Sequence, residues 1–104
     1  MMSTMTTTAE VLRNAATIIE RHGWTQGEAI SETGSCCAIG AIELATNVLG
    51  RPDKQPSVYG FFFRHLVLKG YDGVVDFNDA PERTADEVTA ELRAAAVVAE
   101  AAEK

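Results

Sequence analysis

Two adjacent cysteines, Cys36 and Cys37, are the residues of this sequence best suited to covalent chemistry. They come just before a run of apolar residues at helical spacing, so they lie where a helix is expected to begin. The free amides at a helix N-terminus lower a thiol pKa and favour the nucleophilic thiolate. The opposing interpretation is packing, which we favour, because free cysteines are among the most commonly buried residues.

A nucleophilic Cys37 would need a base and a polar group that stabilises an oxyanion. His65 or His22 is the candidate base, and Gln26 and Asn78 are the candidate polar groups. The chain order glutamine, cysteine, histidine, asparagine is that of the papain-like cysteine peptidases. A catalytic triad is recognised by its geometry, however, so a small thiol-dependent hydrolase or transferase is the alternative function.

Metal ions and cofactors find little support in the sequence. The soft ligands are Cys36, Cys37, His22 and His65, and no CxxC or HxxxH pair occurs. Adjacent cysteines chelate one tetrahedral ion poorly. We therefore expect no metal site and no cofactor.

Length and composition favour one small domain that remains in the cytoplasm. The chain has 104 residues, of which 46% are hydrophobic and 23% charged, and its formal net charge is −6. That apolar content suffices for one core. The nine Lys and Arg residues are scattered, so we expect no direct nucleic-acid binding. The start of the chain does not have the pattern of a secretory signal, and no long apolar run predicts a membrane span.

Apolar periodicity predicts an all-α, compact four-helix single domain over residues 1–104. The expected helices lie near residues 8–22, 36–49, 56–69 and 84–100. Ordered loops are expected at 23–35 and 70–83, the second with at most a helical turn. Residues 1–7 and 101–104 are expected to fray.

The third predicted helix is apolar on nearly every side, which is typical of a central helix. Its aromatic residues exceed what so small a core is expected to bury, so they form a candidate partner or oligomer interface. These residues are Tyr59, Phe61, Phe62 and Phe63.

Local signals surround the two predicted loops. Gly40 within the second helix predicts close approach by another helix or by the Trp24 ring. Thr84 and Glu87 form a capping-box pattern at the start of the last helix. Arg83 is expected to pair with Asp79 or Glu82, and a paired-carboxylate site at Asp76 and Asp79 stays open as an alternative.

Three pieces of the sequence, taken in order, resemble a small bacterial and bacteriophage domain of unknown function. They are Trp24-Thr25-Gln26-Gly27, Cys37-Ala38-Ile39-Gly40-Ala41 and the segment 77–88, and the resemblance extends from Val11 to Ala96. It makes Cys37 the family-like cysteine and Cys36 incidental. It implies no established activity, and it implies one spatial unit over the N-terminal end of the second helix: Trp24, Gln26, Gly27, Cys37, Gly40, Asn78, Asp79, Arg83 and Thr84.

The function that the sequence favours is a non-enzymatic accessory protein. We expect it to bind a host protein or another copy of itself, through the loop face or the aromatic segment. The resemblance suggests a phage origin.

Overall fold

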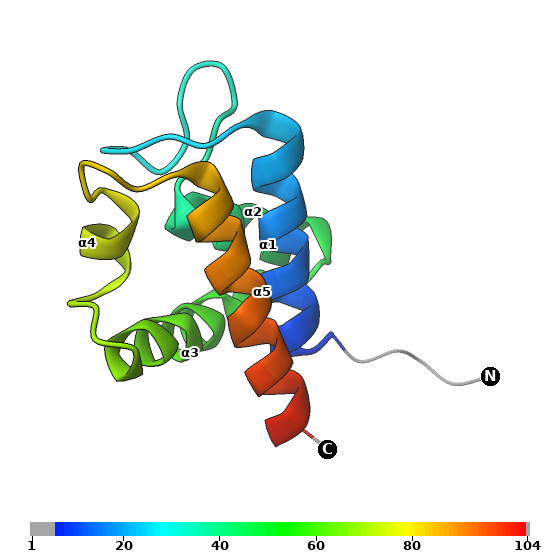
Figure 1. Cartoon of the computed structure of the whole chain (residues 1–104). Helices are drawn as coiled ribbons and strands as arrows, with labels where there is room; N and C mark the ends of the chain where they lie inside the picture. Colours follow the sequence, from blue (N-terminus) through cyan, green and yellow to red (C-terminus); the bar gives the residue numbers. More distant parts are fainter. Residues whose placement is uncertain (1–5, 104) are drawn as a thin grey trace.

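The computed structural model describes residues 6–103 and contains five α-helices and one short 3-10 helix. The N-terminal and C-terminal helices run side by side along one face of the molecule (Figure 1). Their bounds are α1 Thr8–His22, α2 Ala38–Val48, η1 Pro52–Lys54, α3 Gln55–Leu68, α4 Val74–Asn78 and α5 Ala85–Ala102. The predicted all-α single domain is therefore confirmed, with α4 as an additional short helix.

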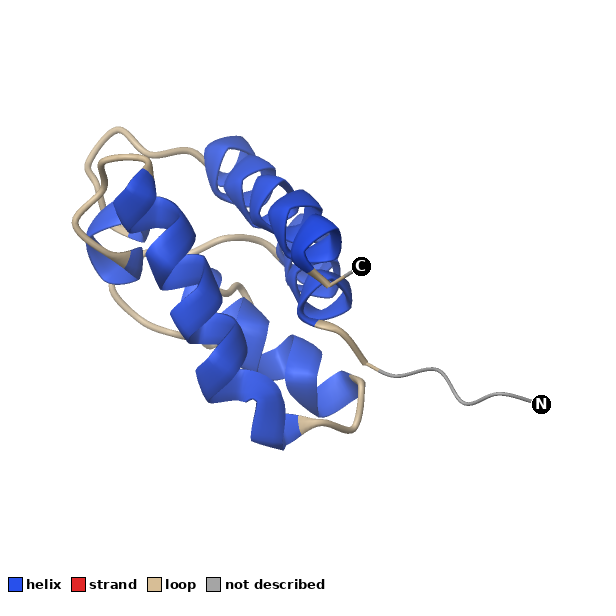
Figure 2. Ribbon diagram, turned by 90° about the horizontal axis from the view of Figure 1, so that it is seen from below, coloured by secondary structure: helices blue, strands red, loops and turns tan. Residues whose placement is uncertain are grey.

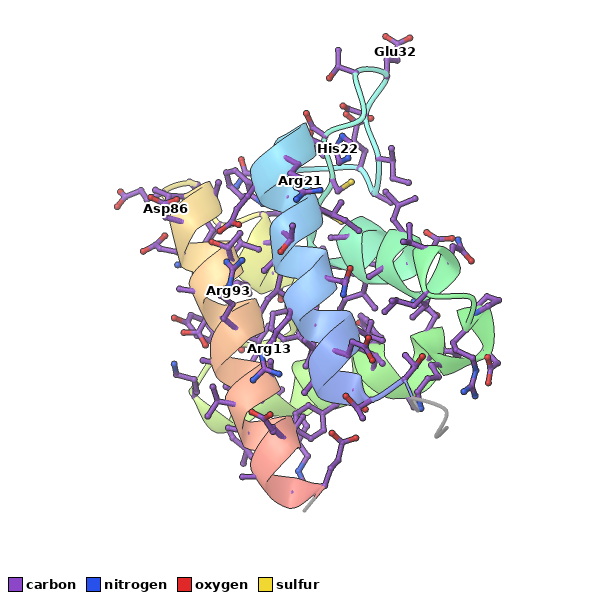
Figure 3. All side chains as sticks on the ribbon, turned by 90° about the vertical axis from the view of Figure 1, so that its right-hand side faces the viewer. Arg13, Arg21, His22, Glu32, Asp86 and Arg93 are labelled. Carbon is purple, nitrogen blue, oxygen red and sulfur yellow. The ribbon has the colours of Figure 1, made fainter. Side chains whose placement is uncertain are left out.

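The centre of the fold is α1, which packs against both α5 and α2. Apolar residues of α1 at helical spacing, including Leu12 and Ile19, are buried there. Two ion pairs bridge α1 and α5 at the surface: Arg13 binds Glu100 at 2.8 Å and Arg93 binds Glu20 at 2.6 Å. Figure 3 shows both arginines on this face of the molecule. Exposed pairs of this kind add little stability, so the apolar contact holds the two helices together.

The expectation that the third helix is central is wrong. Of the residues of α3, Val58, Phe62 and Leu66 are buried, whereas Leu68 is 75% exposed. Neighbouring elements cover only one face of α3, so only the apolar side chains on that face are buried. The remaining apolar residues of α3 therefore lie at the surface.

The segment predicted as the second ordered loop contains α4 in its middle. This helix has only five residues and buries Val74, Phe77 and Asn78. So short a helix is marginal by itself, and its stability must come from tertiary contacts. Thr84 begins α5 with the predicted capping box, in which its side chain accepts from the Glu87 amide and the Glu87 side chain accepts from the Thr84 amide.

The long first loop folds back on itself beside the start of α2. Isolated β-bridges join Cys36 to Trp24 and to Ile30, and residues 6–103 contain helices and loops but no strand (Figure 2). None of the described helices is long and apolar enough to cross a membrane.

The expected fraying at the chain ends falls partly on residues 1–5 and 104, which lie outside the described residues. Thr7 is ordered as the N-cap of α1, where its side chain accepts a hydrogen bond from the Glu10 amide. Helix α5 continues to Ala102, further than the sequence predicted.

Candidate functional site

Asn78, the last residue of α4, joins the loop face into one unit. Its side chain is 2% exposed and uses its full hydrogen-bonding capacity. Oδ1 accepts from Trp24 Nε1 at 2.8 Å and from the Ala38 amide at 3.0 Å. Nδ2 donates to the Thr25 carbonyl at 3.1 Å and to Asp79 Oδ1 at 2.9 Å. One amide thus fastens the first loop, the start of α2 and the end of α4 together.

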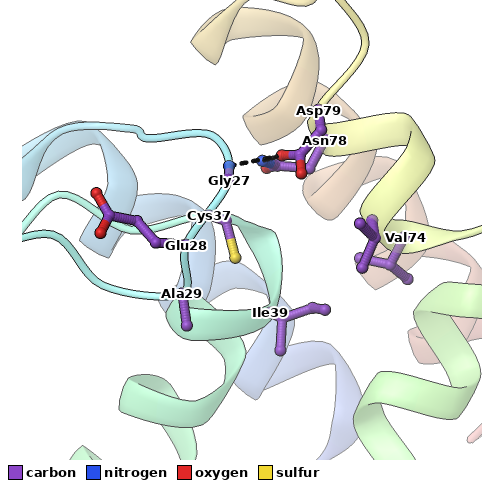
Figure 4. Close-up of a pocket in the computed structure, with 9 residues that line it drawn as sticks. Gly27, Glu28, Ala29, Cys37, Ile39, Val74, Asn78 and Asp79 are labelled. Atoms are coloured by element: carbon purple, nitrogen blue, oxygen red, sulfur yellow. Dashed lines mark hydrogen bonds between the residues drawn. The ribbon is translucent and has the colours of Figure 1, made fainter.

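Gln26 and Gly27 add a second set of bonds between the two loops. Gln26 Nε2 donates to the carbonyls of Asn78 at 3.0 Å and Ala80 at 2.9 Å. The Gly27 amide donates to Asp79 Oδ1 at 3.1 Å, as Figure 4 shows. Gly27 has a φ of +81°, a conformation that side-chain-bearing residues rarely adopt. The side chains of Gln26 and Asp79 therefore bind the protein's own backbone.

Cys37 is the N-cap of α2. Its Sγ accepts a hydrogen bond from the Gly40 amide at 3.4 Å, and the residue is 8% exposed. Its own amide donates to the Ala29 carbonyl at 3.0 Å. The thiol replaces the hydroxyl or carboxylate that usually caps a helix. Capping gives Cys37 a structural role that needs no reactivity.

Gly40 is required by the close approach of the first loop. A Cβ at this position would overlap the carbonyl oxygen of Ala29 and lie 2.8 Å from its carbonyl carbon. The prediction that Gly40 admits a close neighbour is correct, but the neighbour is a loop backbone. It is neither another helix nor the Trp24 ring.

Cys36 is fully buried in the core. Its thiol donates to the Gly34 carbonyl at 3.4 Å. Burial raises the pKa of Cys36, with a further contribution from the neighbouring Cys37. A buried thiol with a raised pKa is a poor nucleophile.

Arg83 holds the end of α4 rather than pairing with Asp79 or Glu82. Its Nε donates to the Phe77 carbonyl at 2.7 Å, and its guanidinium lies 4.2 Å from the Phe77 ring centroid and 5.2 Å from that of Tyr71. It also binds Glu87 at 3.3 Å. The bond to the Thr84 amide, helped by Arg83, holds the pKa of Glu87 below its ordinary value. Arg83 and Thr84 thus connect the loop face to α5.

A small cavity of about 180 Å³ opens between the first loop, the start of α2 and α4 (Figure 4). Apolar side chains dominate its walls, and Cys37, Asn78 and Asp79 are the lining residues with polar side chains that the sequence had singled out. The lining residues are Gly27, Glu28, Ala29, Cys37, Ile39, Val74, Val75, Asn78 and Asp79. This is where a ligand of the loop face would bind.

His65 belongs to a different part of the molecule. Its Nε2 lies 2.9 Å from Glu91 Oε1 on α5, and Lys69 Nζ donates to Glu91 Oε2 at 2.7 Å. Burial acts to raise the pKa of Glu91, but Lys69 and His65 lower it more, so the net pKa is lowered. The structure therefore places Asn78 and Cys37 on one cavity and binds Gln26 to the Asn78 carbonyl, but it places His65 on a separate cavity between α3 and α5.

The candidate interface residues of α3 divide by exposure. Phe62 is fully buried and Phe63 is 41% exposed, while Tyr59 and Phe61 are half-buried. A partner could contact Phe63 and the edges of Phe61 and Tyr59. Phe62 serves the core.

Two residues that organise these sites were not predicted. Ala29 contributes only its carbonyl, and Glu91 is one acidic residue among several on α5. Neither has a sequence signal, because Ala29 acts through a backbone group that every residue has and Glu91 binds residues of another helix. Within residues 6–103, no group of three or more His, Cys, Asp and Glu residues is arranged to hold a metal ion.

The geometry defines a small all-α domain in which one buried asparagine fastens a long loop to a short helix. This arrangement unites the three pieces of sequence that suggested a domain of unknown function. The chain belongs to the family of unknown function DUF6197, whose family model matches residues 3–98. No match was found among the curated proteins or the solved structures.

Proposed function

We propose that this chain is a non-enzymatic, cytoplasmic protein-interaction module that binds its partner through a groove between α3 and α5. The observation that carries the proposal is the apolar surface around that groove. Leu68 of α3 and Val98 of α5 line this groove and are 75% and 50% exposed. Contiguous apolar surface on a small protein marks a partner site.

The loop face supports the same proposal, because the polar side chains that the sequence singled out there hold the fold together. Asn78, Gln26 and Asp79 bind backbone or neighbouring side chains, and Cys37 caps α2. Groups that hold a fold in this way have little freedom to activate a substrate. By extension of the family resemblance, we propose a phage-encoded chain whose partner is a host protein.

Site-specific photocrosslinking in the cells that encode the chain tests this function. The photoreactive residue p-benzoylphenylalanine replaces Leu68 in one variant and Val48 in a control, because Val48 is similarly exposed at 72% and lies on α2. We expect a defined protein adduct from position 68 and none from position 48. Absence of an adduct at position 68, or the same adducts from both positions, would contradict the proposal.

A second candidate function is thiol chemistry at Cys37. The observation that favours it is the cavity beside the Cys37 side chain. The rate of iodoacetamide labelling near neutral pH distinguishes a thiol enzyme from the interaction module. Labelling faster than that of a small-molecule thiol would favour the enzyme, whereas slower labelling is expected for a buried helix cap.

A further inference from the structure

The groove between α3 and α5 is lined by one continuous face of α3. Phe61, Arg64, His65 and Leu68 all line it and stand at positions i, i+3, i+4 and i+7. Residues at this spacing share one side of a helix. Helix α5 supplies the opposite wall through Val98, and the cavity has a volume of about 440 Å³. This face of α3 is thus the surface that a further helix would cover.

The lining residues of α3 form a stripe along the helix from Phe61 to Leu68. Val67 and Val97 are 43% and 61% exposed, but each is next in the chain to a lining residue and so points about 100° away from it around its helix. A helix of about two turns, roughly 11 Å long, would reach along the whole stripe from Phe61 to Leu68.

The groove is bordered by positive charge on a chain whose net charge is −6. Arg64 is exposed and forms no ion pair with the described residues, unlike Arg13 and Arg93. Lys69 pairs with Glu91, so these two charges cancel and the charge of Arg64 is left over. The local balance at the groove is therefore positive, which attracts a negatively charged partner and orients it.

Resting on the proposed function, we propose that the occupant of this groove is an acidic amphipathic helix of a partner protein. Its apolar face lies on Phe61, Leu68 and Val98, and its carboxylates face Arg64 and Lys69. This is the common mode in which an amphipathic helix enters an apolar groove. A second copy that met this groove with its own groove is disfavoured as occupant, because an isologous contact would bring the positive Arg64 side of one copy against the same side of the other.

Selection from a displayed library of random 16-residue sequences, with the intact chain as bait, tests the proposal. We expect enrichment of sequences with apolar residues at helical spacing flanked by Asp and Glu. Arg64→Glu should lower the affinity for the selected peptides at least about tenfold, and Leu68→Lys should abolish binding. Val48→Lys on α2 is the matched control and should leave binding unchanged.

The other outcomes separate the proposal from the function on which it rests. Groove-dependent enrichment of basic or uncharged sequences would overturn the acidic occupant while leaving a docking groove in place. Selected peptides that bind the Arg64→Glu and Leu68→Lys variants as tightly as the parent chain would contradict docking in the groove. A dimer in sedimentation experiments that Leu68→Lys dissociates would show that a second copy is the occupant. Unchanged thermal melting of both variants excludes misfolding as the cause.

Discussion

The side-chain oxygen of Asn78 lies 2.8 Å from the indole nitrogen of Trp24, although 54 residues separate the two in the chain. The same oxygen accepts the Ala38 amide at the start of α2. A single buried acceptor therefore fixes the position of the first loop and the beginning of a helix at once. This relationship explains why the loop face is ordered without any regular sheet.

Asn78→Ala should lower the free energy of unfolding by about 2 to 4 kcal/mol, because it leaves the Ala38 amide and the Thr25 carbonyl without partners in a buried site. Urea unfolding followed by circular dichroism measures the change. Asp76→Ala, an exposed position on the same helix, is the control and should change stability by less than about 0.5 kcal/mol. Equal effects of the two substitutions would show that Asn78 is not the anchor.

Gly40→Ala and Gly60→Ala should change the free energy of unfolding in opposite directions. At Gly40 the new methyl group would overlap the Ala29 carbonyl, so we expect a loss of about 1 to 3 kcal/mol. At Gly60, in α3, a Cβ meets nothing within 4 Å, so the better helix propensity of alanine should add about 0.5 to 1 kcal/mol. Thermal melting of both variants decides the matter, and a stabilised Gly40→Ala protein would contradict the close approach.

Cys37→Ser should preserve stability and Cys37→Ala should reduce it by about 1 kcal/mol. A serine hydroxyl can accept the hydrogen bond from the Gly40 amide that Sγ accepts, whereas alanine cannot. Denaturant unfolding of the two variants compares them directly. If both lose the same stability, capping is not what Cys37 contributes.

Acid should weaken the contact between α3 and α5 through Glu91. Its pKa is lowered in the folded state, so its stabilising effect is present above the unfolded value of 4.5 and is lost as the pH falls through the folded pKa. Glu91→Gln should therefore flatten the fall of stability below about pH 5. Melting temperatures from pH 7 to pH 3 test this.

The control for the acid effect is Glu82→Gln, which removes an exposed carboxyl from the loop before α5. We expect its pH profile to match that of the parent chain. Identical profiles for the parent chain and Glu91→Gln would refute the role of Glu91.

Local patterns predicted the helices well because their signals lie within the helices themselves. Apolar spacing and the glycine at position 23 located the end of α1, and Thr84 with Glu87 located the start of α5. Helix α4 was missed, since five residues carry too short a period to distinguish a helix from a loop. The side chains that it buries, Val74, Phe77 and Asn78, have partners in other elements that a local pattern does not show.

The sequence by itself determined the all-α class and the need for a glycine at position 40, and the family resemblance suggested that the two loops meet over the start of the second helix. Only the tertiary structure decided that Ala29 is the neighbour of Gly40, that His65 binds Glu91, and that α3 leaves one face uncovered. The physical reason is the distance along the chain over which each signal acts. Periodicity and capping act over a few residues, whereas these contacts join segments whose meeting depends on how the whole core packs.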